Sequence, residues 1–181
     1  MKISLLDNGL DSLKKGFSYL KTYEKEYHLE EENEKRFYLL KDAILSVHHG
    51  IEILLKYILY KESEYLILSE INENVKNAFV DKRNKKLKSI FETNLSDKIH
   101  TVSFEESIER IEKICGFILK NSLSQKFMKL QKYRNQIIHA EFNFNENEIN
   151  KLFDGLVDDI DGFLKDTIGN EYKTLTGYGE L

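Results

Sequence analysis

Proline is absent from this chain of 181 residues, and cysteine occurs only once. Without proline the strongest helix breaker is missing, and the abundance of Leu, Ile, Glu and Lys favours an all-α fold over a sheet-rich one. The single cysteine, Cys115, follows the spacing of an apolar helical stripe and has no partner, so no intrachain disulfide can form. We therefore expect an all-α protein in a reducing, cytoplasmic compartment.

Several segments that define common functional classes are also missing. No apolar run approaches the roughly 18 residues that cross a bilayer, and the N-terminal segment at 1–15 is too short and too mixed for a signal peptide. The chain contains no Gly-x-Gly-x-x-Gly or Gly-x4-Gly-Lys phosphate loop and no Gly-x-Ser-x-Gly signature. We expect no membrane partner, and we disfavour the mainstream nucleotide hydrolases and serine hydrolases.

Metal-ligand spacing is missing as well. His48 and His49 are adjacent and point to different faces of a helix, and the chain has no His-x3-His pair. The lone cysteine cannot supply a Cys-x2-Cys pair. The sequence therefore disfavours a metal-dependent hydrolase, and it predicts neither a metal site nor a cofactor.

The charge balance is mildly acidic, with a formal net charge of −4. That balance argues against a protein that coats nucleic acid by bulk electrostatics. Positive charge is nevertheless concentrated in one basic segment, whose cations are Lys82, Arg83, Lys85, Lys86 and Lys88. A local RNA contact is one interpretation of this segment, and a solvated loop or helix face is the other.

Apolar residues recur at helical spacing along most of the chain. They predict five helices, over about residues 5–27, 30–61, 103–120, 122–139 and 149–169. Residues 62–101 are less periodic and predict an irregular insert between the second and third core helices, and residues 171–181 predict a loose tail. With 41% hydrophobic residues, the chain is expected to form a single domain over 1–170, built as a helical bundle.

One helical segment, Arg-Asn-Gln-Ile-Ile-His at 134–139, carries residue types that suit phosphodiester chemistry without a metal. A guanidinium is a permanent, planar phosphate binder, and an imidazole exchanges protons near neutral pH. Asn135 and His139 are four residues apart and share a helix face, with Arg134 at its shoulder. Arg134 also interrupts the apolar stripe, where an unpaired buried charge is costly. The alternative is a solvated arginine followed by an ordinary histidine of a last helical turn.

Helices in this order, with Arg-polar-x3-His late in the chain, resemble the HEPN superfamily, whose signature is an Arg followed four to six residues later by a His. The stretch at 42–56 in the second helix is also similar to HEPN proteins. Many HEPN domains are metal-independent endoribonucleases of toxin-antitoxin, abortive-infection and CRISPR systems, and they commonly build the active site from two protomers. The resemblance implies RNA as substrate, 2′,3′-cyclic phosphate and 5′-hydroxyl ends as products, and an antitoxin or defence-system protein as a further partner.

Under this resemblance each site residue has a role. His139 is the general acid or base on the ribose 2′-hydroxyl or the leaving 5′-oxygen, Arg134 stabilises charge on the phosphorane, and Asn135 orients the phosphate. Glu52, at the border of the apolar stripe of the second helix, is expected to pair with Arg134, and His48 lies one turn earlier in the same column. One Arg and one His are few groups for this reaction, so a homodimer with a composite site is expected.

The residues around the motif histidine also bear on how such a protein would be regulated. HEPN toxins that are controlled by adenylylation often carry a tyrosine two residues after the motif histidine, and Glu141 occupies that position here, with Tyr133 next to the site. We therefore do not expect this route of regulation. A non-catalytic HEPN-like module, which dimerises or binds a partner protein or a nucleotide, is the alternative function.

Overall fold

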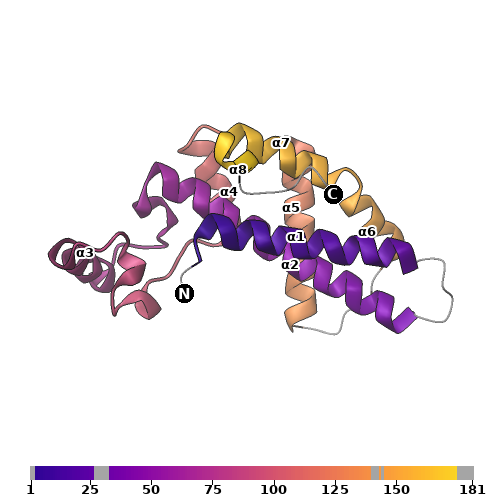
Figure 1. Cartoon of the computed structure of the whole chain (residues 1–181), viewed down its shortest axis with the longest axis horizontal. Helices are drawn as coiled ribbons and strands as arrows, with labels where there is room; N and C mark the ends of the chain where they lie inside the picture. Colours follow the sequence, from indigo (N-terminus) through magenta and orange to yellow (C-terminus); the bar gives the residue numbers. More distant parts are fainter. Residues whose placement is uncertain (1–2, 27–32, 140–142, 144, 175–181) are drawn as a thin grey trace. The chain divides into compact units, whose positions relative to one another are not determined.

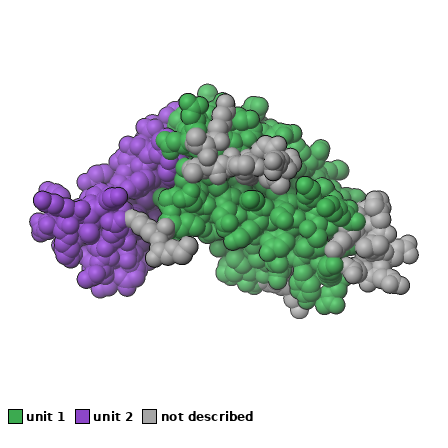
Figure 2. Space-filling model, viewed as in Figure 1, with its two compact units in different colours: residues 1–54, 117–181 green, residues 55–116 purple. Residues whose placement is uncertain are grey.

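The computed structural model describes residues 3–26, 33–139, 143 and 145–174. These residues form helices joined by turns (Figure 1), and within them the only β-type pairing is an isolated bridge between Leu68 and Thr101. The predicted all-α class is confirmed. The chain groups into two compact units, a first unit of residues 1–54 and 117–181 and a second unit of residues 55–116 (Figure 2).

The first unit is built on α1 (Leu5–Glu26) and α2 (Asn33–Glu62), an antiparallel pair whose backbones nearly touch. A Cβ atom on Gly50 would lie 2.8 Å from the backbone nitrogen of Leu13 and 2.9 Å from the oxygen of Gly9. A Cβ atom on Gly16 would lie 2.8 Å from the nitrogen of Val47. Side chains do not tolerate such distances to backbone atoms, so only glycine allows this close crossing.

The rest of the first unit contains α5 (Asn121–His139), α6 (Glu146–Phe153), α7 (Leu156–Ile168) and α8 (Asn170–Thr174). One helix was predicted over 149–169, but the chain breaks between α6 and α7, where Gly155 has φ 62°. The predicted tail from 171 overlaps α8, whose Tyr172 is buried. The remainder of that tail, 175–181, lies outside the described residues. The count of about five helices is not confirmed.

The second unit turns the predicted irregular insert into a structure with its own hydrophobic core. It contains the last part of α2 and two whole helices, α3 (Glu73–Lys85) and α4 (Phe104–Lys113). It also contains three short 3-10 helices, which are η1 (Glu64–Ile67), η2 (Ile90–Glu92) and η3 (Ser96–Lys98). The side chains that form its core are Leu68, Val75, Ala78, Ile90 and Ile99. α4 begins after Ser103, whose hydroxyl oxygen accepts from the Glu106 backbone N–H at 3.2 Å, and it ends before the predicted residue 120. Gly116, with φ 75°, follows its end.

α2 contains a long apolar segment. Among the described residues, its part from Glu34 to Glu62 is long and apolar enough, by length and composition, to span a membrane. The expectation that no such run exists is therefore wrong on composition. In the structure 56% of the apolar window is buried against the rest of the chain. A core helix of a globular protein passes the same test of length and composition.

Candidate functional site

The last two turns of α5 carry the predicted trio. Arg134 donates from Nη1 to Oδ1 of Asn135 at 2.9 Å. Arg134 is half-buried, whereas Asn135 and His139 are exposed. His139 is the last residue of α5, one turn beyond Asn135 on the same face. The structure thus joins Arg134 to Asn135 and leaves the imidazole open at the end of the helix.

Arg134 differs in its bonding from Arg36, which is buried, and from Arg110, which is half-buried. Arg36 donates to Glu146 at 2.9 Å, and Arg110 donates to Glu106 at 2.7 Å. Within the described part of the chain, no carboxylate lies within ion-pair distance of Arg134, whose side chain bonds only the neutral amide of Asn135. Among these residues, therefore, no acidic group compensates its positive charge.

Glu52 does not form the expected ion pair with Arg134. Glu52 Oε2 lies 3.9 Å from Nδ1 of His48, one turn earlier on α2. His48 is buried and Glu52 is half-buried. The two residues share one column of α2, as the spacing indicated, and their contact is an ion pair whenever the imidazole is protonated. If His48 and Glu52 support the site, they do so without a direct salt bridge to Arg134.

Tyr133 ties α5 to α6 directly beside Arg134. Its hydroxyl donates to Oε2 of Glu148 at 2.9 Å, and Lys129 Nζ lies 3.7 Å from the same carboxylate. Burial, and then the hydrogen bond to Glu148, raise the pKa of Tyr133 to about 12. The hydrogen bond from Tyr133 and the charge of Lys129 lower the pKa of Glu148. The contacts of Glu148 and Lys129 were missed in the sequence, because no local spacing relates α6 to α5.

Two cations of the basic segment form ion pairs within the second unit, and the other three do not. Lys82 Nζ bonds Glu64, and Lys85 lies 2.8 Å from Asp81 on the same helix. Three exposed side chains of the segment form no ion pair within the described residues, and these are Arg83, Lys86 and Lys88. Of the five predicted RNA contacts, these three retain an uncompensated charge.

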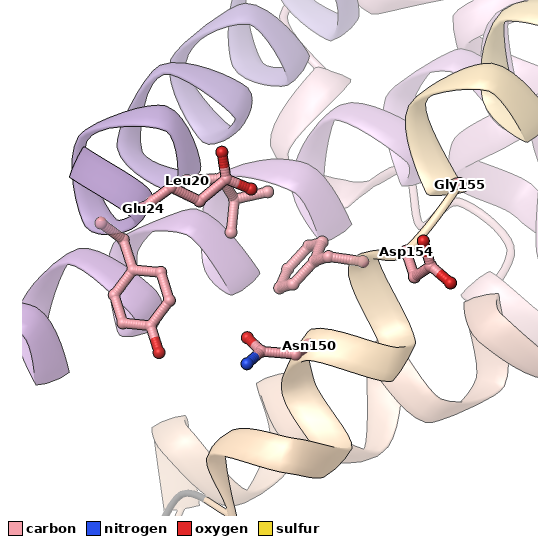
Figure 3. A pocket seen from close by; sticks show the side chains of 7 residues that line it. Leu20, Glu24, Asn150, Asp154 and Gly155 are labelled. Carbon is pink, nitrogen blue, oxygen red and sulfur yellow. The ribbon is translucent and has the colours of Figure 1, made fainter. Parts of the chain in front are cut away.

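A cavity of about 490 Å³ lies elsewhere in the first unit, between α1 and α6 (Figure 3). The residues that line it are Leu20, Tyr23, Glu24, Asn150, Phe153, Asp154 and Gly155. None of them was singled out in the sequence, where the two lining segments stand more than 100 positions apart. Within the residues that the structure describes, no three His, Cys, Asp or Glu side chains are grouped so that they could hold a metal ion.

Comparison with known proteins supplies no relative whose residue roles could be transferred to this chain. No protein-family model, curated protein or solved structure matches it. What the site can do is therefore argued from its own groups. The end of α5 presents a guanidinium with an uncompensated charge, an amide with two N–H donors and an exposed imidazole.

Proposed function

We propose that this chain is a HEPN-like, metal-independent endoribonuclease of a toxin-antitoxin or phage-defence system, acting in the cytoplasm without a cofactor. The observation that supports this function best is the bonding of Arg134. The Arg134 side chain is half-buried, bonds only a neutral amide, and has no acidic partner among the described residues. Such a charge gains most from an anionic ligand, and a phosphodiester is the anion on which a neighbouring imidazole can act.

Each group of the trio has a task in this reaction. The bond from Arg134 to Asn135 Oδ1 uses the amide oxygen, so the amide N–H donors and the remaining guanidinium donors are available to phosphate oxygens. His139 takes the proton from the ribose 2′-hydroxyl, whose oxygen then attacks phosphorus, or gives a proton to the leaving 5′-oxygen. Arg134 stabilises the charge that develops on the phosphorane. The products are a 2′,3′-cyclic phosphate and a 5′-hydroxyl end.

The exposure of Asn135 and His139 supports a composite site in a homodimer. Cleavage requires one proton to be removed and another to be supplied, and one chain offers a single imidazole at this end of α5. Two copies related by a two-fold axis would supply one histidine for each task. In this dimer the C-terminal ends of the two α5 helices face each other. An antitoxin or another defence-system protein would control access to the exposed site.

The decisive experiment incubates the purified protein with total RNA in EDTA. We compare the wild type with His139→Ala and with the matched control His49→Ala, which removes another exposed helical histidine. We expect chelator-resistant cleavage that falls at least about 100-fold in His139→Ala and is unchanged in His49→Ala. The fragments should end in cyclic phosphates. Cleavage that EDTA abolishes, or that His139→Ala retains, contradicts the proposal.

The second candidate function is a non-catalytic HEPN-like module that dimerises or binds a partner protein or a nucleotide. The observation in its favour is that neither Asn135 nor His139 lines the cavity described above, and both are exposed. This module would sediment as a dimer and leave RNA intact in the wild type and in both variants. Cleavage that depends on His139 rules it out.

A further inference from the structure

The second unit carries two stacked aromatic rings, and one of them is exposed. Tyr65 on η1 and Phe79 on α3 lie with their ring centres 4.5 Å apart and their ring planes 15° from parallel. Tyr65 is 52% exposed although Phe79 covers one face of its ring, so the opposite face is open to solvent. Large apolar side chains gain from burial, and an exposed ring that is held flat by a second ring is available to a further planar group.

The backbone around Tyr65 holds its ring in place. The hydroxyl oxygen of Ser63 caps η1 and accepts from the Tyr65 backbone N–H at 3.3 Å. The carbonyl oxygen of Tyr65 accepts from the backbone N–H of Leu68 at 3.2 Å, and Leu68 belongs to the core of the second unit. A ring that is already ordered loses little conformational entropy when a ligand binds. The ring pair is therefore a preformed stacking surface.

The carboxylate next to the exposed ring is compensated inside the second unit. Glu64 precedes Tyr65 in the chain, and its side chain is only 10% exposed. Its carboxylate bonds Lys82 Nζ, and it accepts from Ser89 Oγ at 2.7 Å and from the Ile90 backbone N–H at 2.9 Å. With these three partners, the carboxylate opposes an anionic ligand at the ring only weakly.

Cations without an ion pair follow the rings along α3. Arg83 is four residues after Phe79 and therefore lies on the same face of the helix, one turn further on. Lys86 is the C-cap of this helix. Both cations are exposed, and neither forms an ion pair within the described part of the chain. The carboxylate of Asp81 lies 2.8 Å from Lys85 Nζ, so it is compensated as well.

An accessible flat ring beside positive charge matches one class of ligand. Single-stranded nucleic acid offers unstacked bases to the ring and phosphates to the cations. A duplex keeps its bases stacked inside, so it can use only the cations. An apolar protein segment would cover the ring but would gain nothing from Arg83 and Lys86. Charge complementarity therefore favours single-stranded RNA, which is also the ligand that the proposed function requires.

We propose that Tyr65 and Phe79 form a stacking platform for single-stranded RNA. An unpaired base stacks on the open face of Tyr65, and Arg83 and Lys86 bind phosphates of the neighbouring nucleotides. The platform lies in the second unit and shares no residue with the trio on α5, so it adds a preference for single strands to the chemistry proposed there. The choice of RNA as the ligand rests on the proposed ribonuclease function.

The test measures binding without cleavage. A fluorescein-labelled 2′-O-methyl oligouridine of about 12 nucleotides is titrated with the full chain, and fluorescence anisotropy gives the Kd. This probe lacks the 2′-hydroxyl that would attack phosphorus, so it stays intact. We expect saturable binding that Tyr65→Ala and Tyr65→Leu weaken at least about fivefold. Tyr65→Phe should bind as the wild type does, because a phenyl ring still stacks on a base.

The control is Tyr38→Ala, which removes a ring of nearly equal exposure, 49%, from the first unit. The Tyr38 hydroxyl donates to Glu34 at 3.4 Å, so a carboxylate adjoins this ring instead of an uncompensated cation. Tyr38→Ala should leave the Kd unchanged, and circular dichroism verifies that each variant is folded. An unlabelled duplex of the same length should compete at least about tenfold less well than the unlabelled single strand.

The proposal is overturned if no saturable binding occurs, if Tyr65→Leu binds as tightly as the wild type, or if the duplex competes equally. An equal loss of affinity in Tyr38→Ala and Tyr65→Ala overturns it as well. If the probe does not bind and only Tyr65→Ala changes the sedimentation coefficient, the surface is a contact between copies of the chain.

The two proposals fail in different ways. Total RNA that stays intact in EDTA contradicts the ribonuclease but leaves a Kd that depends on Tyr65 unaffected. Cleavage of total RNA together with a Kd that does not depend on Tyr65 contradicts the platform alone.

Discussion

Arg110 of the second unit and Arg134 of the first are both half-buried helical arginines, and their bonding is opposite. Arg110 donates through Nε to Glu106 at 2.7 Å and through Nη1 to the carbonyl oxygens of Leu66 and Leu68 at 2.9 and 2.8 Å. Arg134 bonds only Asn135. The guanidinium of Arg110 pairs with a carboxylate and donates to two carbonyl oxygens that would otherwise lack a donor. The guanidinium of Arg134 has no acidic partner among the described residues. We infer that one arginine stabilises the fold and the other serves a ligand.

The largest expected effect separates the two arginines by activity. Under the proposed ribonuclease function, Arg134→Ala should lower the single-turnover cleavage rate about 100- to 1000-fold, which corresponds to roughly 3–4 kcal/mol. Arg134→Lys should recover little, because lysine lacks the planar fork of donors. The free energy of unfolding, measured in urea, should change by less than about 0.5 kcal/mol. If Arg134→Ala cleaves RNA normally but loses unfolding free energy, Arg134 stabilises the fold and does not serve a ligand.

Arg110→Ala should show the opposite pattern. It leaves the carbonyls of Leu66 and Leu68 and the carboxylate of Glu106 without their donor, so we expect a loss of about 2–4 kcal/mol in unfolding free energy. Urea unfolding followed by circular dichroism measures this loss. Cleavage per folded molecule should be unchanged, with Lys113→Ala, an exposed residue of the same helix, as the control. An unfolding midpoint equal to that of the wild type would mean that Arg110 does not stabilise the second unit.

The sequence was sufficient to single out Arg134 but not its partner. A cation that interrupts an apolar stripe is visible from spacing alone, as is the shared column of His48 and Glu52. Whether Glu52 of α2 reaches Arg134 of α5 depends on how each helix is rotated about its axis, and periodicity does not determine that rotation. For the same reason the contact between Tyr133 and Glu148, which joins two helices, could not be predicted.

The insert was underestimated for a different reason. α3 buries only Val75 and Ala78, so its 13 residues offer too few apolar positions to reveal a helical period. The break after α6 had a weak signal in Gly155, since glycine inside a helix costs about 1 kcal/mol relative to alanine. Residues whose role depends on a distant contact, such as Arg110 with the carbonyl of Leu66, carry no signal in local sequence.

Tyr133→Phe tests whether the support beside Arg134 is itself structural. Losing the hydrogen bond to the exposed carboxylate of Glu148 should cost about 0.5–1 kcal/mol of unfolding free energy. The pKa of Tyr133 is raised from 10.0 to about 12 in the folded state, so the folded chain holds the phenol proton more tightly than the unfolded chain. Its stabilising contribution is complete below pH 10 and disappears as the pH rises to about 12.

The measurement for Tyr133 is urea unfolding of both proteins across this pH range. The difference in stability between the wild type and Tyr133→Phe should shrink above pH 10. A difference that stays constant from neutral pH to pH 12 would show that the hydroxyl proton does not contribute. Cleavage that changes more than stability would instead assign Tyr133 to the positioning of Arg134.

The smallest expected effects carry the same contrast between paired and unpaired cations into the basic segment. Arg83→Gln and Lys86→Gln remove exposed charges without partners, so each should weaken RNA binding only two- to five-fold and reduce the salt dependence of the affinity by about one counterion. Lys82→Gln removes the partner of Glu64, and its main effect should be on the unfolding midpoint. RNA titrations at several salt concentrations, beside urea unfolding, measure both quantities. If Lys82→Gln and Lys86→Gln weaken RNA binding equally, an internal ion pair does not prevent a cation from binding RNA. The distinction between the paired Arg110 and the unpaired Arg134 then loses its physical basis.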